Sequence, residues 1–314
     1  MAVMAAAKMR IDLQGPRNEK PRVVFPNEPS PPESVSLRID RFEMKFEITP
    51  AQRAALMADL GPRLRPDENA GTGARYPVVS LYYDNAERDC YWENARSLPS
   101  RRKLRVRVYG SRDGSVPAVS FVEIKHKCEG RGVKRRVLLP LAQALRVCEG
   151  LQPEGMTLAE PERRIIAEVH DLVLRHGFRP VMVMRYDRSA FAGVEPGSDL
   201  RVTFDEGIRA RLGNLTPEPD DRRFEPGDEM QGDGSIVMEV KATGCIPYWF
   251  SLTIAGAGCR MQSHSKYCRT LERRDAVLRA MLSPNWRARH ATDVSGKVVA
   301  ISPRPTPMLS PVAG

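Results

Sequence analysis

The 314-residue sequence predicts an α+β protein built on an antiparallel sheet of eight strands. Three observations lead to this fold class. Five segments alternate apolar and charged side chains at every second residue, which is the period of a half-buried strand, and eight segments in all are predicted to be strands. Two connections between these segments are short glycine-containing turns, and such turns join antiparallel strands. Four further segments are predicted to be helices, which makes the class α+β.

The alternation is clear along the predicted strand 102–109. In one segment Leu104, Val106 and Val108 occupy one set of positions, and basic residues occupy the positions between them. Turns at 113–114 and 130–132 join this segment to the next strand and that strand to the one after it. Eight strands is about the number at which a closed barrel leaves a usable interior. The predicted strands are 38–48, 77–84, 102–109, 118–127, 132–139, 179–187, 199–205 and 235–242.

Helices are predicted at 50–60, 141–149, 159–177 and 265–282. Thr49 and Pro50 open the first of them, as an N-cap residue followed by proline in the first helical position. One continuous globular region is therefore expected over 38–282. The proline-rich segment 1–37 lacks an apolar period and is predicted to be a disordered arm, and 283–314 is predicted to be a basic, proline-rich tail.

Composition restricts the class of partner. The formal net charge is +10, from 49 Lys+Arg against 39 Asp+Glu, which favours anionic partners such as nucleic acids, nucleotides or phosphates. Nucleic acid is not expected, because an aromatic content of 6% provides few rings for base stacking. The six cysteines have no zinc-site spacing and are expected to be free thiols. Because no apolar run approaches the ~18–20 residues of a membrane span, a cytoplasmic protein is expected. The oligomeric state stays open.

The alternation also gathers charged residues on one face of the strands. Surplus cations that converge on such a face need an anionic ligand, and the planar fork of arginine suits phosphate. The alternative is that these faces are simply solvated. The predicted inward cations are Arg41, Lys45, Lys103, Arg105, Arg107, Lys125, Lys127, Lys134, Arg136, Arg185, Arg201, Lys241 and Lys266. The predicted inward acids are Glu43, Glu47, Glu123, Asp187, Asp205 and Glu239.

Carboxylates among phosphate-binding cations point to a divalent metal, with Mg²⁺ or Mn²⁺ as the hard-ligand candidates. Glu239 is the best single candidate for a metal ligand, and the alternative is that it forms an ion pair with a neighbouring cation. His126 has the opposite strand parity from Lys125 and Lys127, so we expect it on the outer face with no catalytic role.

Eight short motifs in this order resemble the VTC-type polyphosphate polymerase domain, a branch of the triphosphate tunnel metalloenzymes. The resemblance covers about 38–282. The motifs are R-F-E-M-K at 41–45, L-R-V-R-V-Y-G at 104–110, E-I-K-H-K at 123–127, K-R-R at 134–136, R-Y-D-R at 185–188, L-R-V-T-F-D at 200–205, V-M-E-V-K at 237–241 and S-K-Y at 265–267.

The resemblance implies a fold, an activity and a site. The implied fold is an antiparallel eight-stranded β-tunnel, a closed barrel with surrounding helices. The implied reaction transfers the γ-phosphate of ATP to a growing inorganic polyphosphate chain, with Mn²⁺ or Mg²⁺ as cofactor and Glu239 as metal ligand. The implied catalytic residues are Lys45, Arg105, Arg107, Lys125 and Lys266. The implied substrate-binding residues are Lys127, Lys134, Arg136, Arg185, Arg201, Lys241 and Ser265.

One departure from the wider superfamily bears on the reaction. That superfamily opens with E-x-E-x-K, whereas here Arg41 stands in the first position. Replacing a metal-binding acid by a cation favours the polymerase branch over the triphosphatase and cyclase branches. Two alternatives stay open: a metal-dependent inorganic or nucleoside triphosphatase of the same fold, and a non-catalytic module that binds polyphosphate or inositol phosphates.

Overall fold

The computed structural model describes residues 10–11, 23–24, 41–67, 75–111, 114, 118–129, 131–195, 197–230, 234–243, 245–262, 265–275 and 278. Two short strands, β1 (Arg10–Ile11) and β2 (Val23–Val24), pair with each other. The rest of the predicted arm 1–37 and the whole predicted tail 283–314 lie outside the described residues.

Nine strands form one large sheet in which every pairing is antiparallel. The α+β class is therefore confirmed. The sheet order is β3-β11-β10-β9-β5-β6-β7-β8, and β4 pairs with the far end of β9. The strands are β3 (Arg41–Ile48), β4 (Leu64–Pro66), β5 (Arg75–Asp84), β6 (Ser100–Tyr109), β7 (Val119–Cys128), β8 (Arg131–Leu139), β9 (Arg179–Gly193), β10 (Arg201–Arg211) and β11 (Ile236–Thr243).

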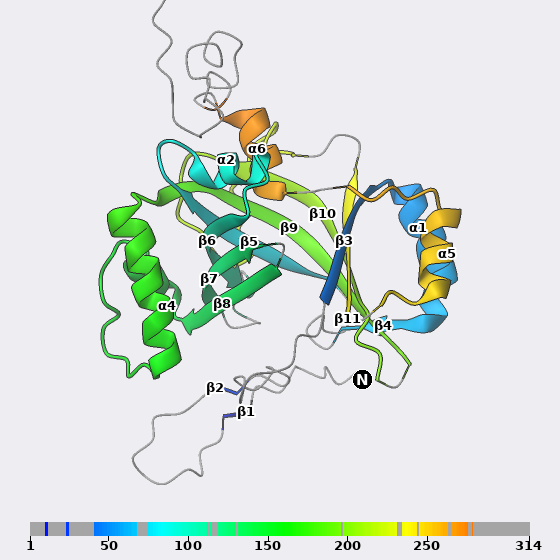
Figure 1. The fold of residues 1–314 in the computed structure, drawn as a ribbon, viewed down its shortest axis with the longest axis horizontal. Helices are drawn as coiled ribbons and strands as arrows, with labels where there is room; N and C mark the ends of the chain where they lie inside the picture. Colours follow the sequence, from blue (N-terminus) through cyan, green and yellow to red (C-terminus); the bar gives the residue numbers. More distant parts are fainter. Residues whose placement is uncertain are drawn as a thin grey trace, which may run out of the picture.

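The sheet curves strongly, but backbone hydrogen bonds do not close it into a barrel. In the described residues β3 and β8 are its two edges, and no pairing joins them. The outer edge of β3 is instead taken up by another segment: Phe46 forms an isolated bridge with Met261, and the Gln262 amide donates to the Lys45 carbonyl at 2.9 Å. The two ends of the sheet nevertheless face each other, because Lys125 Nζ on β7 lies 3.5 Å from Glu43 Oε1 on β3. The predicted eight-stranded closed barrel is thus corrected to a nine-stranded, curled open sheet (Figure 1).

Helices cover the convex side of the sheet as two separate layers on opposite flanks (Figure 1). On one flank α1 (Pro50–Leu60) and α5 (Tyr248–Gly256) cover β3, β10 and β11 and bury Leu56, Phe204 and Phe250. On the other flank α3 (Leu141–Val147) and α4 (Glu160–His170) enclose a larger apolar core with β5 to β9, and α2 (Asp89–Ala95) adds Cys90 and Tyr91 to this core from one end of the sheet. Each layer buries one face of the sheet and leaves the opposite face to the charged side chains.

A sixth helix, α6 (Lys266–Arg274), lies across one end of the curved sheet, beside α2 (Figure 1). Tyr267 and Leu271 pack in the same apolar cluster as Met182 and Val237, and the ring of Tyr267 lies 5.4 Å from that of Tyr82. The Tyr267 hydroxyl donates to the buried Asp84 carboxylate at the end of β5. This end of the interior is therefore filled by α6.

Several element boundaries differ from the sequence prediction. The predicted helix 159–177 is α4 followed by a π-helical turn over Asp171–Arg175. The predicted helix 265–282 ends at Arg274, because the next residue has an extended backbone, and 279–282 lie outside the described residues. The prediction missed the helices α2 and α5 and the short strands β1, β2 and β4. Both missed helices are short and rich in aromatic or β-branched residues, which have weak helix propensity.

No helix in the described part of the chain has the length and apolar character needed to cross a bilayer.

Candidate functional site

The face of the sheet turned away from the helices carries rows of charged side chains. We call it the inner face, defined by Lys45, Arg105, Lys125 and Glu239. Strand pairing places Lys103, Lys125 and Lys134 directly opposite one another on β6, β7 and β8. Side chains in such positions lie about 5 Å apart at Cβ, so this row brings three like charges together. The Lys103 ammonium donates to Ser265 Oγ at 2.9 Å, while Lys125 and Lys134 are about half exposed.

The neighbouring row on the same strands combines Arg105, Glu123 and Arg136. Glu123 is 2% exposed, and its carboxylate accepts from Arg105 Nε at 2.6 Å and lies 3.5 Å from Lys134 Nζ. Burial alone would raise the pKa of Glu123, but Arg105, Arg107 and Lys134 outweigh it and hold that pKa well below the usual range. Glu123 is thus a permanent anion within a larger group of cations.

The other predicted cations of this wall also lie on the inner face. Lys127 is exposed and pairs in register with Arg101, and the Arg136 guanidinium lies 4.6 Å from the centre of the Phe121 ring. Arg107 is 7% exposed and donates to Ser80 Oγ and to the Tyr186 hydroxyl, each at 3.3 Å.

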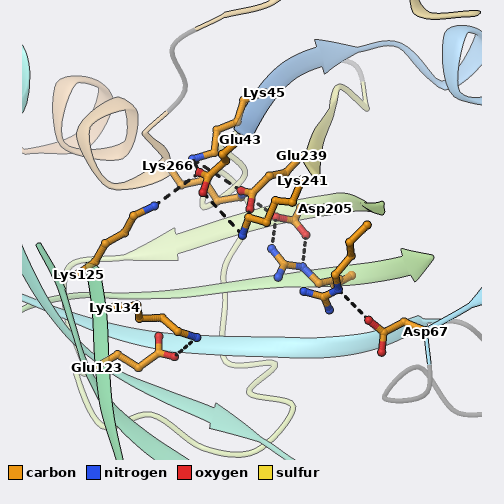
Figure 2. A network of polar contacts seen from close by, with 12 residues as sticks. Glu43, Lys45, Asp67, Glu123, Lys125, Lys134, Asp205, Glu239, Lys241 and Lys266 are labelled. Atoms are coloured by element: carbon orange, nitrogen blue, oxygen red, sulfur yellow. Dashed lines mark hydrogen bonds and ion pairs between the residues drawn. The ribbon is translucent and has the colours of Figure 1, made fainter. Parts of the chain in front are cut away.

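The facing wall, formed by β3 and β11, alternates acids and lysines. Glu239 is opposite Lys45, and Lys241 is opposite Glu43. The Glu43 carboxylate lies 2.6 Å from the ammonium group of Lys45, 3.5 Å from that of Lys125 and 3.7 Å from that of Lys241 (Figure 2). The Glu239 carboxylate forms an ion pair with Lys241 and a longer one, at 3.6 Å, with Lys45. Burial would raise the pKa of Glu239, but Lys241 and Lys45 lower it well below its ordinary value.

On β10, which is next to β11 in the sheet, the inner face carries an ion cluster around a buried carboxylate. Asp205 on β10 is 0% exposed; it accepts two hydrogen bonds from Arg188, at 2.6 and 2.8 Å, and one from Lys266 at 2.6 Å. Both cations also lie over the Tyr186 ring. Burial opposes the ionisation of Asp205, but Lys266 and Arg188 lower its pKa to about 2. Lys266 therefore reaches the interior from the first turn of α6.

Arg185 and Asp187 do not face the interior. Arg185 forms ion pairs with Asp187 at 2.9 Å and with Asp220 at 2.8 Å on the outer face, whereas Arg188 and Tyr186 lie on the inner face. The motif R-Y-D-R has arginines at an odd separation, so the two must point to opposite faces. The sequence prediction chose the wrong one. The signal that could have identified Arg188 is its partner across the sheet. Arg188 lies directly opposite Asp205, which was already predicted to be an inward acid.

The remaining predicted residues lie close to this cluster or near its margin. Ser265 caps α6, accepting from the Cys268 amide at 3.3 Å and from Lys103. Arg201 is on the inner face in register with Lys241, and its Nε donates to Asp67 at 2.7 Å. The side chain of Arg41 lies outside the described residues. His126 has the outer parity expected for it, opposite Arg102, and it shares a hydrogen bond with Ser100.

Glu239 and Glu43 are the residues that could hold a divalent metal. They are diagonal neighbours on β11 and β3, and the charge of Glu239 raises the pKa of Glu43, although the surrounding lysines lower it overall. No group of three metal-ligating side chains occurs among the described residues. Two carboxylates fit Mg²⁺ or Mn²⁺ where the other ligands are phosphate oxygens and water, which is the usual arrangement at phosphoryl-transfer sites.

Comparison with known proteins is consistent with the family suggested by the motifs. The VTC domain model matches residues 40–273. Among solved structures, a Bacillus halodurans protein provisionally named adenylate cyclase is 10% identical, with a TM-score of 0.42 over 74% of this chain and 96% of that chain. No curated protein sequence matches significantly. Because the domain model spans well over half of the 314 residues and includes both walls of the interior, this chain belongs to the VTC domain family.

Proposed function

We propose that the protein is an ATP-dependent polyphosphate polymerase that transfers the γ-phosphoryl group of ATP to the end of an inorganic polyphosphate chain. One observation carries the proposal: in the described part of the chain the interior combines surplus cations with carboxylates that ion pairs or hydrogen bonds already hold. The first property suits a polyanion. The second leaves poor candidates for a base that would activate water.

The surplus of cations is greatest on β6, β7 and β8. Two unit charges ~4 Å apart interact by about 4 kcal/mol at an effective dielectric near 20, so a row of lysines is costly without anions between them. Burial and the neighbouring cations lower the pKa of Lys134 and of Lys125, although nearby carboxylates oppose this. Phosphate oxygens placed between Lys103, Lys125 and Lys134 would remove this repulsion.

The carboxylates argue against water as the acceptor. A general base works best with a pKa near the operating pH. The pKa values of Glu43, Glu123 and Glu239 are all lowered, and that of Asp205 is about 2. Burial raises the pKa of Asp84, but its carboxylate is held under α6 by Tyr267 and two backbone amides. A terminal phosphate is already ionised and needs no base, so this arrangement favours a phosphate acceptor.

In the proposed reaction a terminal polyphosphate oxygen forms a bond to the γ-phosphorus of ATP, and the bond from that phosphorus to the β–γ bridging oxygen breaks to release ADP. Arg105, Arg107 and Lys266 bind the transferred group, and Lys45, Lys125 and Lys241 neutralise the flanking phosphates. Lys127, Lys134, Arg136, Arg201 and Ser265 bind the remainder of the substrates. Positioning and charge neutralisation supply most of the acceleration in such reactions.

Glu239, with Glu43 beside it, would hold Mn²⁺ or Mg²⁺. A divalent ion held there would supply positive charge to the phosphate oxygens of the donor.

The test is to incubate the purified protein with ATP and Mn²⁺ or Mg²⁺ and to separate the products on a polyphosphate gel. We expect a ladder of polymer with stoichiometric ADP, and its loss in Glu239→Gln and in Arg105→Ala. The control is Arg164→Ala, which removes a cation from the exposed surface of α4. Free phosphate without polymer would identify a triphosphatase and contradict the proposal. Tight polyphosphate binding without turnover would also contradict it and would indicate a binding module.

A further inference from the structure

The helix α5 exposes an uncharged, partly apolar face. Its exposed residues Tyr248, Ser251, Leu252 and Ala255 have the spacing of a single helical face, and we call them the α5 face. Tyr248 is 77% exposed and Leu252 is 54% exposed. The opposite side of the helix packs Phe250 and Ile254 into the core, so α5 carries no charge on any side and is largely apolar. Such helices are usually buried, which makes a solvent-facing one informative.

The helix α4 on the other flank provides a comparison, because its solvent-facing side is charged. The exposed side of α4 carries Glu160, Arg163 and Arg164, which form ion pairs with one another. The two helices lie on opposite flanks of the sheet (Figure 1). The uncharged α5 face is therefore a property of that flank and not of the molecular surface in general.

An arginine lies near each end of α5, and the segment itself carries no negative charge. From Cys245 to Gln262 the sequence contains no acidic residue. The Arg63 guanidinium lies 4.8 Å from the Trp249 ring at the start of the helix, and Arg260 is exposed shortly after its end. Within the described residues neither arginine forms an ion pair. An apolar face with an arginine near each end is complementary to a surface whose outer layer is anionic and whose deeper layer is apolar.

We propose that the α5 face docks on an anionic phospholipid bilayer, with the helix lying in the plane of the headgroups. Tyr248 and Trp249 support this assignment, because tyrosine and tryptophan prefer the boundary between headgroups and acyl chains. A second copy of the chain is less suitable, because a symmetric contact through a short helix would bring the arginines of both copies towards each other. The inference goes beyond the proposed function and does not depend on it.

The test is cosedimentation of the full chain with phosphatidylcholine vesicles, with and without phosphatidylserine. We expect binding to the anionic vesicles and weaker binding to the neutral ones. Tyr248→Ser/Leu252→Ser should weaken binding to anionic vesicles by roughly tenfold or more, because the apolar area available for burial falls. Arg260→Glu should also weaken it. The matched control is Leu174→Ser, which changes an apolar side chain that is 63% exposed at the end of the α4 flank and should leave binding unchanged.

The basic interior is a second possible source of vesicle binding, so the assay is repeated with excess tripolyphosphate. Binding through the α5 face persists under that condition. Release by tripolyphosphate, equal weakening by Leu174→Ser, or no binding to anionic vesicles would each overturn the proposal. Sedimentation equilibrium without lipid tests whether the α5 face instead contacts a second copy of the chain. A dimer that the Tyr248/Leu252 double variant dissociates would assign the face to a second copy and would also overturn the proposal.

Discussion

The two walls of the interior use similar side chains in different proportions. In the wall formed by β3, β11 and β10, which we call the balanced wall, Glu43, Glu239 and Asp205 alternate with nearby cations. In the wall formed by β6, β7 and β8, which we call the cationic wall, Glu123 is the one acidic side chain on the inner face within the described residues.

This difference separates charges that hold the structure together from charges that the proposed function assigns to substrate binding. On the balanced wall, removal of one partner leaves another charge buried and unpaired, which is strongly destabilising. On the cationic wall, removal of a lysine relieves repulsion between like charges. Charge-removing substitutions on the two walls should therefore have opposite effects on stability, and the predictions below test that contrast.

The largest effect is expected for Asp205→Asn. The substitution leaves Arg188 and Lys266 without their buried carboxylate. We expect the free energy of unfolding to fall by about 3–5 kcal/mol, as when one partner of a buried ion pair is removed. Urea unfolding measures the change. A loss below about 1 kcal/mol, the range of exposed ion pairs, would contradict the structural role of the balanced wall.

Arg105→Ala tests the cationic wall through catalysis. Loss of an inner-face donor to a developing negative charge costs roughly 10²–10³ in rate, so we expect kcat/KM for polymer formation to fall about a hundredfold. Arg102→Ala is the matched control, because Arg102 is on the same strand with outer parity, opposite His126. Similar kinetics for the two variants would mean that the inner face has no special role in the reaction.

Acidification should weaken the balanced wall through Asp205. Its pKa falls from 3.8 to about 2 on folding, so its ionised form stabilises the folded state above about pH 4, and this contribution is lost as the pH falls towards 2. At ~1.4 kcal/mol per pKa unit the contribution is about 2 kcal/mol. Urea unfolding at pH 7, 4 and 3 should show this decline, and Asp205→Asn should show a shallower one. Equal declines would assign the acid sensitivity to other groups.

The smallest change in stability is expected for Lys134→Met. Because burial and neighbouring cations lower the pKa of Lys134, its charge disfavours the folded state, and since the side chain is about half exposed we expect stability to stay constant or to rise only slightly. Tripolyphosphate should nevertheless bind roughly tenfold more weakly, since one charge-assisted contact is lost. Calorimetric titration and urea unfolding measure the two quantities. A clear loss of stability would show that the lysine row is structural.

The comparison of prediction with structure is clearest in β7 and β9. In β7 the alternation correctly placed Glu123, Lys125 and Lys127 on one face and His126 on the other. In β9 both faces carry an arginine, so alternation separated Arg185 from Arg188 but did not show which of them is inside. The same limit applies to α5, whose aromatic and β-branched residues suit a strand as well as a helix.

By itself the sequence determined which residues share a face of each strand, the antiparallel class, the capped start of α1 and the excess of cations. These properties depend on the period of the backbone and on neighbours a few residues apart. Only the tertiary structure decided which face became the interior, that α6 fills one end, and that β3 pairs with 261–262 instead of closing on β8. Such choices depend on sheet curvature and on contacts between residues far apart in the sequence, and no local pattern encodes them.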